Sequence, residues 1–168
     1  APGFNTLTIA VILVAVETIL TGAFHLDGLA DTFDAFLSSG KTREEKLAIM
    51  KDSRIGVMGC VSLILSLLLK TTLLAGLLEH HRASALLVYP VAGRWVQVVA
   101  YVVSPYVREG GIGSIFSRNA GKSTLLAASL FLIPCCALSG FLPAVLLLAV
   151  FLWLYRSYVH RQIGGITG

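Results

Sequence analysis

The sequence predicts an all-α, polytopic integral membrane bundle. Apolar residues make up 56% of its 168 residues, charged residues make up only 13%, and the mean hydropathy is +0.83. Several apolar stretches reach the roughly 20 residues that a helix needs to cross a hydrocarbon core. So few charges cannot cover a globule with polar groups, which excludes a soluble cytosolic fold. The same composition excludes a disordered chain.

Three apolar stretches each predict one membrane-spanning helix. They cover residues 6–24, 56–78 and 83–104. Each is long enough for one crossing as a helix. The polar side chains that interrupt them include Glu17, Lys70, Arg94 and Gln97.

A fourth apolar block, residues 123–158, is too long for a single crossing. Pro134, Gly140 and Pro143 interrupt it and favour a tight reversal near Ser139. The block therefore predicts two further spans, which makes five in all.

A short helix at the membrane surface is predicted between the first two spans. Thr42 and Glu45 have the spacing of a capping box, in which each side chain bonds the backbone N–H of the other residue. The apolar residues Leu47, Ile49 and Met50 follow this box, as expected for a helix that lies on the membrane.

The basic residues predict the orientation of the spans. If residues 25–55 face the cytoplasm, residues 105–122 and the end of the chain lie on the same side. Lys and Arg concentrate in cytoplasmic loops, and the opposite orientation would place ten of them outside. The cytoplasmic residues are then Lys41, Arg43, Lys46, Lys51, Arg54, Arg108, Arg118, Lys122, Arg156 and Arg161.

Three carboxylates follow the first span. Asp27, Asp31 and Asp34 are spaced at i, i+4 and i+7, so on a helix they fall within about 60° of one face. Like charges this close repel one another unless a cation lies between them. The pattern favours a Mg²⁺ site, or Mn²⁺, completed by water and substrate phosphate. A solvated acidic helix face is the alternative.

Two further residues near this cluster are candidates for the same site. Glu17 lies at membrane depth, where a carboxylate needs a polar cavity, so we expect it to point toward the cluster and to bind the metal. His25, two residues before the first carboxylate, is a candidate general base or phosphate donor. A helix-capping or interfacial histidine is the alternative.

The segment before the second span carries Lys51, Ser53 and Arg54, followed by Gly56. Two cations and a hydroxyl suit a phosphate group, and a glycine lets backbone approach it. The alternative is a basic flank that only orients the span.

A second set of phosphate-binding candidates lies later in the chain. Arg94 is expected to be buried at membrane depth, where an arginine needs an anionic partner. Arg108 opens a loop whose glycines, Gly111 and Gly113, present backbone suited to a phosphate. For Lys70 two roles are open: a functional one, or a side chain that extends its ammonium group toward the membrane interface.

Together these residues resemble one enzyme family. The run from Glu17 through His25 to Asp34, the stretch 50–56, Gly93 with Arg94, the loop 108–113 and the closing stretch 164–168 are similar to motifs of the cobalamin (5'-phosphate) synthases. This family is also named adenosylcobinamide-GDP ribazoletransferase. The likeness covers nearly the whole chain. Residues 1–168 are then expected to form one membrane-embedded catalytic domain, incomplete at both ends, with an acidic segment at 25–55 and a basic glycine loop at 105–122.

The resemblance implies transfer of a cobinamide phosphate group from adenosylcobinamide-GDP to α-ribazole or its 5'-phosphate, with release of GMP. Mg²⁺ would bridge the diphosphate, and Lys51, Arg54, Arg94 and Arg108 would neutralise its remaining charge. His25 or a carboxylate, either Asp34 or Asp52, would take the hydroxyl proton.

The expected partners are therefore the corrinoid-GDP donor, the ribazole acceptor and the bilayer of a prokaryotic inner membrane, with no nucleic acid. The sequence leaves the oligomeric state open. A CDP-alcohol-type phosphatidyltransferase also sets spaced aspartates at a membrane face, and a cation transporter also places charges at membrane depth. Both stand as alternatives, although neither requires the histidine before Asp27 or the basic stretch 51–56.

Overall fold

The structure, a computed structural model, describes residues 5–82, 84–108 and 113–167. Within these residues the chain forms eight α-helices, and its only β pairing is an isolated bridge. The predicted all-helical membrane fold is therefore confirmed. The chain divides into two compact units, Ala1–Ala83 and Ser84–Gly168.

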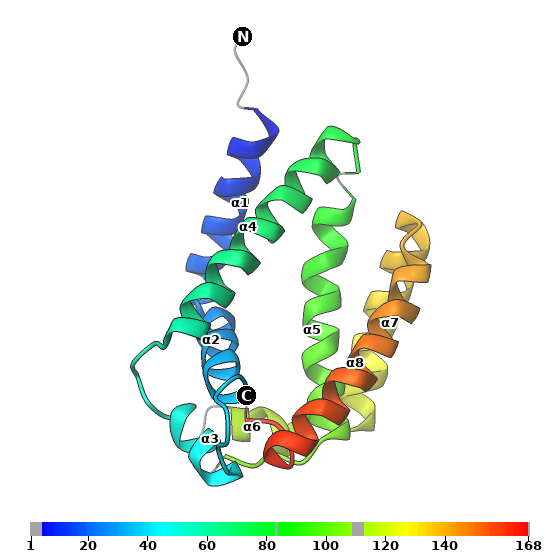
Figure 1. Cartoon of the computed structure of the whole chain (residues 1–168). Coiled ribbons are helices and arrows are strands. Elements are labelled where there is room, and N and C mark those ends of the chain that lie inside the picture. The colour runs from blue at the N-terminus through cyan, green and yellow to red at the C-terminus, as the bar shows by residue number, and fades with distance from the viewer. Residues whose placement is uncertain (1–4, 83, 109–112, 168) are drawn as a thin grey trace. The chain divides into compact units, whose positions relative to one another are not determined.

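The first unit contains four helices, which Figure 1 shows in blue, cyan and green. Both α1 and α2 pack against α4, and the short α3 packs against α2. Their bounds are α1 Thr6–Leu20, α2 Phe24–Phe36, α3 Arg43–Ile49 and α4 Val57–Glu79.

The first predicted span, residues 6–24, is shorter in the structure than the sequence suggested. Helix α1 ends at Leu20, so its 15 residues reach only about 22 Å at 1.5 Å per residue. Gly22 and Ala23 then adopt left-handed backbone, with φ of +60° and +57°. This turn bends the axis of α2 by 89° from that of α1. The acidic motif therefore lies on a separate helix, α2.

The capping box predicted before α3 is confirmed. The Glu45 Oε2 accepts from the Thr42 backbone N–H at 2.8 Å, and the Thr42 Oγ1 accepts from the Glu45 N–H at 3.3 Å. The backbone bond from Thr42, with the nearby charge of Lys41, lowers the pKa of Glu45 below its usual range.

The second unit contains the other four helices. The main contact joins α5 to α7 around buried Val88, Leu132 and Cys136. Trp95 on α5 also donates its indole N–H to the Ser129 hydroxyl of α7 at 2.9 Å. The bounds are α5 Ala85–Val103, α6 Gly113–Asn119, α7 Lys122–Ser139 and α8 Leu142–Ile163.

The reversal predicted near Ser139 is confirmed. Helix α7 ends at Ser139, and Gly140 adopts a φ of +73° before α8 begins at Leu142. Helix α6 was not predicted from the sequence, because its seven residues are too few for a clear apolar pattern.

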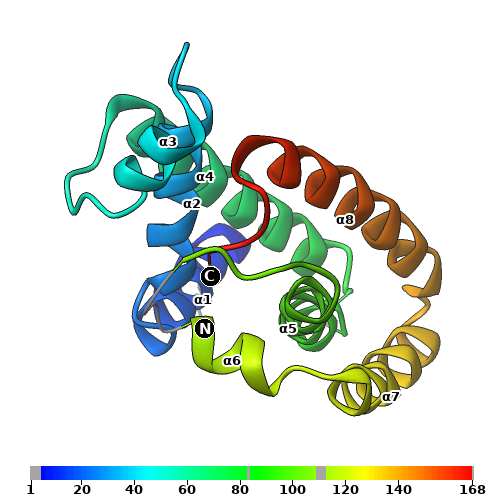
Figure 2. The same cartoon turned by 90° about the horizontal axis from the view of Figure 1, so that it is seen from below.

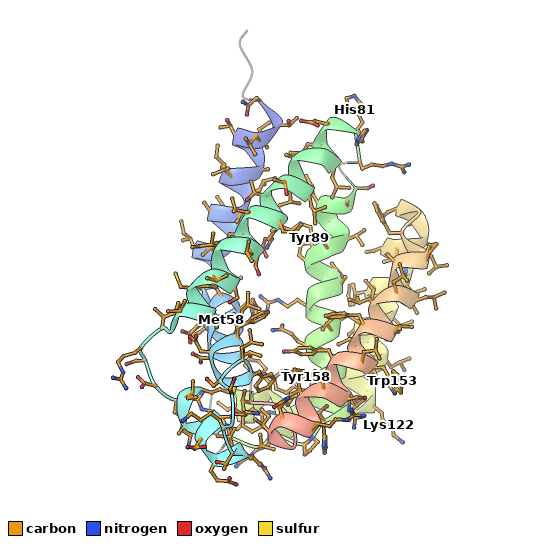
Figure 3. The ribbon with its side chains drawn as sticks, viewed as in Figure 1. Met58, His81, Tyr89, Lys122, Trp153 and Tyr158 are labelled. Atoms are coloured by element: carbon orange, nitrogen blue, oxygen red, sulfur yellow. The ribbon has the colours of Figure 1, made fainter. Side chains whose placement is uncertain are left out.

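Four helices, α4, α5, α7 and α8, are long and apolar enough to cross a membrane, and α1 with α2 would add a fifth as one broken span. Many large apolar side chains on these helices stay exposed, as expected for lipid contact. Trp153 and Tyr158, labelled on α8 in Figure 3, are exposed near the basic end of that helix. Aromatic residues of this kind anchor helices at membrane interfaces.

Candidate active site

Helix α2 brings two of the three predicted carboxylates to one pocket. Asp27 and Asp31, one helical turn apart, line a pocket of about 280 Å³ together with Ser53 and Arg54. Apolar side chains complete its wall, among them Leu63 of α4. The acidic motif and the basic segment are separated by some twenty residues in sequence, and the fold brings them together within the first unit.

The third carboxylate, Asp34, has a different position. Its Oδ2 accepts from the Gly56 backbone N–H at 2.7 Å, and its Oδ1 accepts from the Gly59 N–H at 2.8 Å. Both donors belong to the start of α4, where Gly56 is the N-cap residue. Asp34 therefore bonds the N-terminus of α4 and does not line the pocket with Asp27 and Asp31.

The carboxylates present suit a small divalent cation, although no three of them converge. Among the described residues, no group of three His, Cys, Asp or Glu side chains is arranged to hold a metal ion. Mg²⁺ is commonly bound by one or two carboxylates and takes its other ligands from water and substrate phosphates. The pair Asp27 and Asp31, beside the Ser53 hydroxyl, fits this donor set. The metal stays a prediction, with these two residues as its best-placed ligands.

Glu17, predicted as a further metal ligand, forms an ion pair within the first unit. Its Oε2 lies 2.7 Å from the Lys70 Nζ of α4, and both side chains are about one-third exposed. An ion pair is an alternative way to accommodate a carboxylate at membrane depth. The pair joins α1 to α4 and also gives Lys70 a partner that sequence reasoning did not foresee.

The basic segment is ordered by a second ion pair. The Arg54 guanidinium donates from Nη2 to the Asp52 Oδ2 at 2.5 Å and from Nε to both carboxylate oxygens at 3.0 Å. The Arg54 backbone N–H also donates to Oδ1 at 3.0 Å. These bonds lower the pKa of Asp52 to about 2 and raise the pKa of Arg54. At neutral pH Asp52 is therefore a poor proton acceptor, and its hydrogen bonds hold the Arg54 side chain.

The remaining candidates of the first unit are His25 and Lys51. His25 lies in the first turn of α2, and its side chain is exposed. Lys51 is also exposed and lies immediately before Asp52. Neither residue lines the pocket that contains Asp27 and Arg54.

The candidates of the second unit lie on separate elements. Arg94 is exposed on α5 rather than buried as predicted. Its Nη1 donates to the Gln97 Oε1, one turn further along the same helix, at 2.9 Å. Arg108 is half-buried, and Gly113 is buried at the start of α6. Gly111 lies outside the described residues.

The loop that leads to Arg108 pairs with the closing glycine stretch, which sequence reasoning did not predict. Val107 donates its N–H to the Ile166 carbonyl at 2.9 Å, and Ile166 donates to the Pro105 carbonyl at 2.9 Å. Figure 2 shows the red end of the chain turning back beside the green segment after α5. A Cβ on the buried Gly165 would collide with the Pro105 carbonyl. The repeated glycines in both segments were the sequence feature that could have indicated this close pairing.

Arg156, counted only as a cytoplasmic charge, also has a structural role. It donates from Nη2 and Nε to the Val103 carbonyl at 2.7 and 3.0 Å. Val103 is the last residue of α5, and a cation stabilises the carbonyl end of a helix.

Comparisons with known proteins agree with the resemblance. The family model described as cobalamin-5-phosphate synthase matches residues 1–168. No solved structure matches the chain. Similar curated proteins are named adenosylcobinamide-GDP ribazoletransferase.

The relative from Pseudomonas fluorescens Pf-5 is 40% identical over 99% of this chain and 70% of its own length. The relative from Pseudomonas syringae pv. syringae is 39% identical over 99% of this chain and 72% of its own length. The relative from Desulforamulus reducens is 39% identical over 99% of this chain and 67% of its own length. Because the family model matches the whole chain, this protein belongs to the cobalamin-5-phosphate synthase family.

Proposed function

We propose that this chain is the membrane-embedded catalytic part of an adenosylcobinamide-GDP ribazoletransferase, a transferase of cobalamin synthesis. The name of its relatives and the family match support this assignment over a phosphatidyltransferase or a transporter. The observation that carries it in the structure is the pocket in which Asp27 and Asp31 meet Ser53 and Arg54. Acidic and basic groups side by side are what a metal-bound diphosphate requires.

In the proposed reaction the ribazole hydroxyl oxygen forms a bond to the phosphorus next to the cobinamide. The bond from this phosphorus to the bridging oxygen breaks, GMP leaves with that oxygen, and the hydroxyl proton passes to a base. Bound Mg²⁺, held by Asp27 and Asp31, would neutralise charge on the phosphates and on the leaving oxygen.

The residues of the basic segment then bind and orient the donor. Arg54, held by Asp52, directs its guanidinium toward a phosphate, and Ser53 supplies a hydroxyl donor at the same pocket. His25 is the proposed base, because it lies in the first turn of α2, the helix that carries Asp27 and Asp31. Asp52 does not suit that role with a pKa of about 2.

The test of this function is GMP release by the protein in detergent or liposomes. The proposal predicts release only when adenosylcobinamide-GDP, α-ribazole and Mg²⁺ are all present. Uptake of a substrate without GMP release would support a transporter, and CMP release from a CDP-alcohol would support a phosphatidyltransferase. Glu44→Gln is a matched control, because it removes an exposed carboxylate of α3 that does not line the pocket.

The apolar helices place the protein in a membrane. We propose that this is the bacterial cytoplasmic membrane and that residues 25–55 and 105–122 face the cytoplasm. In a background without Cys60, Cys135 and Cys136, single cysteines at Ser39 and Ser117 should resist an impermeant thiol reagent outside intact cells, and one at His80 should react. The reverse labelling pattern would overturn this orientation.

A further inference from the structure

The carboxylate of Asp34 connects α2 to the start of α4. A helix leaves its first four backbone N–H groups without intrahelical partners, and a negative charge there is favourable. Asp34 accepts two N–H groups at this end, from Gly56 at 2.7 Å and from Gly59 at 2.8 Å. The N-cap residue of α4, Gly56, has no side chain that could bond this end, so Asp34 acts as its cap from 22 residues earlier in the chain.

The two glycines make this approach possible. A Cβ on Gly56 or on Gly59 would collide with the Asp34 carboxylate. A Cβ on Gly59 would also lie 3.0 Å from the Ala30 carbonyl of α2. Gly56 has ordinary extended backbone, with φ of −89°. These glycines are therefore required by space and not by backbone conformation.

This cap lies directly beside the pocket along both chain segments. On α2, Asp31 lies less than one turn before Asp34 and lines the pocket. On the other segment, Ser53 and Arg54 line the pocket just before Gly56. The two bonds of Asp34 therefore fix the basic segment relative to the carboxylates of α2.

We propose that Asp34 is a positioning residue, which holds Ser53 and Arg54 opposite Asp27 and Asp31, and that metal binding depends on Asp27 and Asp31. This inference rests on the proposed function for its kinetic readout. It differs from the sequence-based expectation that Asp34 binds the metal, because both Asp34 oxygens already accept hydrogen bonds from α4.

The test compares Asp34→Asn with Gly59→Ala, which disturbs the same contact from its other side without removing a carboxylate. Asparagine would place an NH₂ donor against a backbone N–H. Gly76→Ala is the matched control, because it lies on α4 with no atom within 4 Å of its Cβ position. Asp31→Asn serves as the metal-site reference.

In the kinetic experiment, the concentrations of adenosylcobinamide-GDP and of Mg²⁺ that give half-maximal GMP release are measured separately. Asp34→Asn and Gly59→Ala should each raise the KM for the donor about tenfold, the effect of one lost charge-assisted hydrogen bond. Both should leave the Mg²⁺ requirement unchanged, and Gly76→Ala should behave as wild type. A raised Mg²⁺ requirement in Asp34→Asn, with none in Gly59→Ala, would show that Asp34 is a metal ligand and overturn the proposal.

A second readout needs no activity and so separates this inference from the proposed function. In protein labelled with ¹⁵N-glycine, the amide protons of Gly56 and Gly59 should show the low-field shifts of bonds to a carboxylate, without substrate or metal. Asp34→Asn should move both signals, whereas Asp31→Asn should not. If Asp34→Asn fails to insert, the Gly56 signal in Gly59→Ala decides the question, because residue 59 carries no glycine label in that variant. Unmoved Gly56 and Gly59 signals in Asp34→Asn, or an unmoved Gly56 signal in Gly59→Ala, would contradict the cap.

Discussion

The Lys70 ammonium lies 2.7 Å from the Glu17 carboxylate and joins α4 to α1 within the first unit. Both residues interrupt apolar helices, so this ion pair fixes the register of the two helices. Since α1 leads through the Gly22 turn into α2, the register also affects where the pocket carboxylates lie.

Lys70→Met should therefore destabilise the protein by about 1–3 kcal/mol, between the values for exposed and buried ion pairs. The double variant Glu17→Gln/Lys70→Met should recover part of this loss, because it leaves no carboxylate beside the missing cation. The midpoint of thermal unfolding in detergent measures both. A double variant as unstable as the sum of the two single variants would show that the pair is not coupled.

The ion pair of Asp52 and Arg54 predicts a pH dependence. The folded-state pKa of Asp52 is lowered from 3.8 to about 2, so the pairing contributes above pH 3.8 and is lost as the pH falls through about 2. The side-chain carboxyl ¹³C shift of Asp52 should titrate near pH 2, and in Arg54→Gln it should titrate closer to 3.8. Titration of Asp52 near pH 4 in the unchanged protein would contradict the pairing.

Gly165 tests the pairing between the loop before Arg108 and the end of the chain. Gly165→Ala inserts a methyl group against the Pro105 carbonyl and the Val107 side chain, so it should destabilise the protein by about 1–3 kcal/mol. It should also lower GMP release if Arg108 binds phosphate. Gly121→Ala, whose Cβ would meet only the Ser123 Oγ at 4.0 Å, is the control for the unfolding measurement. Equal stability of the two variants would mean that the close approach is absent.

A substitution at Arg94 distinguishes bidentate binding of a phosphate from a role that needs only its positive charge. If Arg94 binds a donor phosphate through two parallel hydrogen bonds, Arg94→Lys should lower kcat/KM for the donor at least about tenfold. Lysine lacks the planar guanidinium that makes both bonds. Gln97→Leu removes its hydrogen-bond partner on the same helix and should have a smaller effect. Unchanged kinetics in correctly inserted Arg94→Lys would assign this arginine a structural role.

The sequence predicted the fold class because apolar length and composition alone decide it. It also predicted α3, since the capping box of Thr42 and Glu45 is local. The break at Gly22 and Ala23 was missed because an apolar stretch does not show where its axis bends.

The candidate site was predicted only in part, because the sequence shows local helix patterns but not contacts between distant residues. Asp27 and Asp31 share a helix face, and helix periodicity shows this. The hydrogen-bond partners of Asp34 are Gly56 and Gly59, which are 22 and 25 residues away. The spacing of residues on α2 carries no information about them. The partner of Glu17 is likewise set by the packing of α1 on α4.

We propose above that Asp27 and Asp31 hold the metal that the transfer requires, opposite Ser53 and Arg54. The most direct measurement is the Mg²⁺ dependence of GMP release by Asp31→Asn in liposomes, with Glu44→Gln as the control. We expect Asp31→Asn to lose turnover at ordinary Mg²⁺ by at least about a hundredfold, as for other interactions that stabilise charge in a transition state, with insertion unchanged. Near-normal GMP release by Asp31→Asn at the same Mg²⁺ concentration would contradict it.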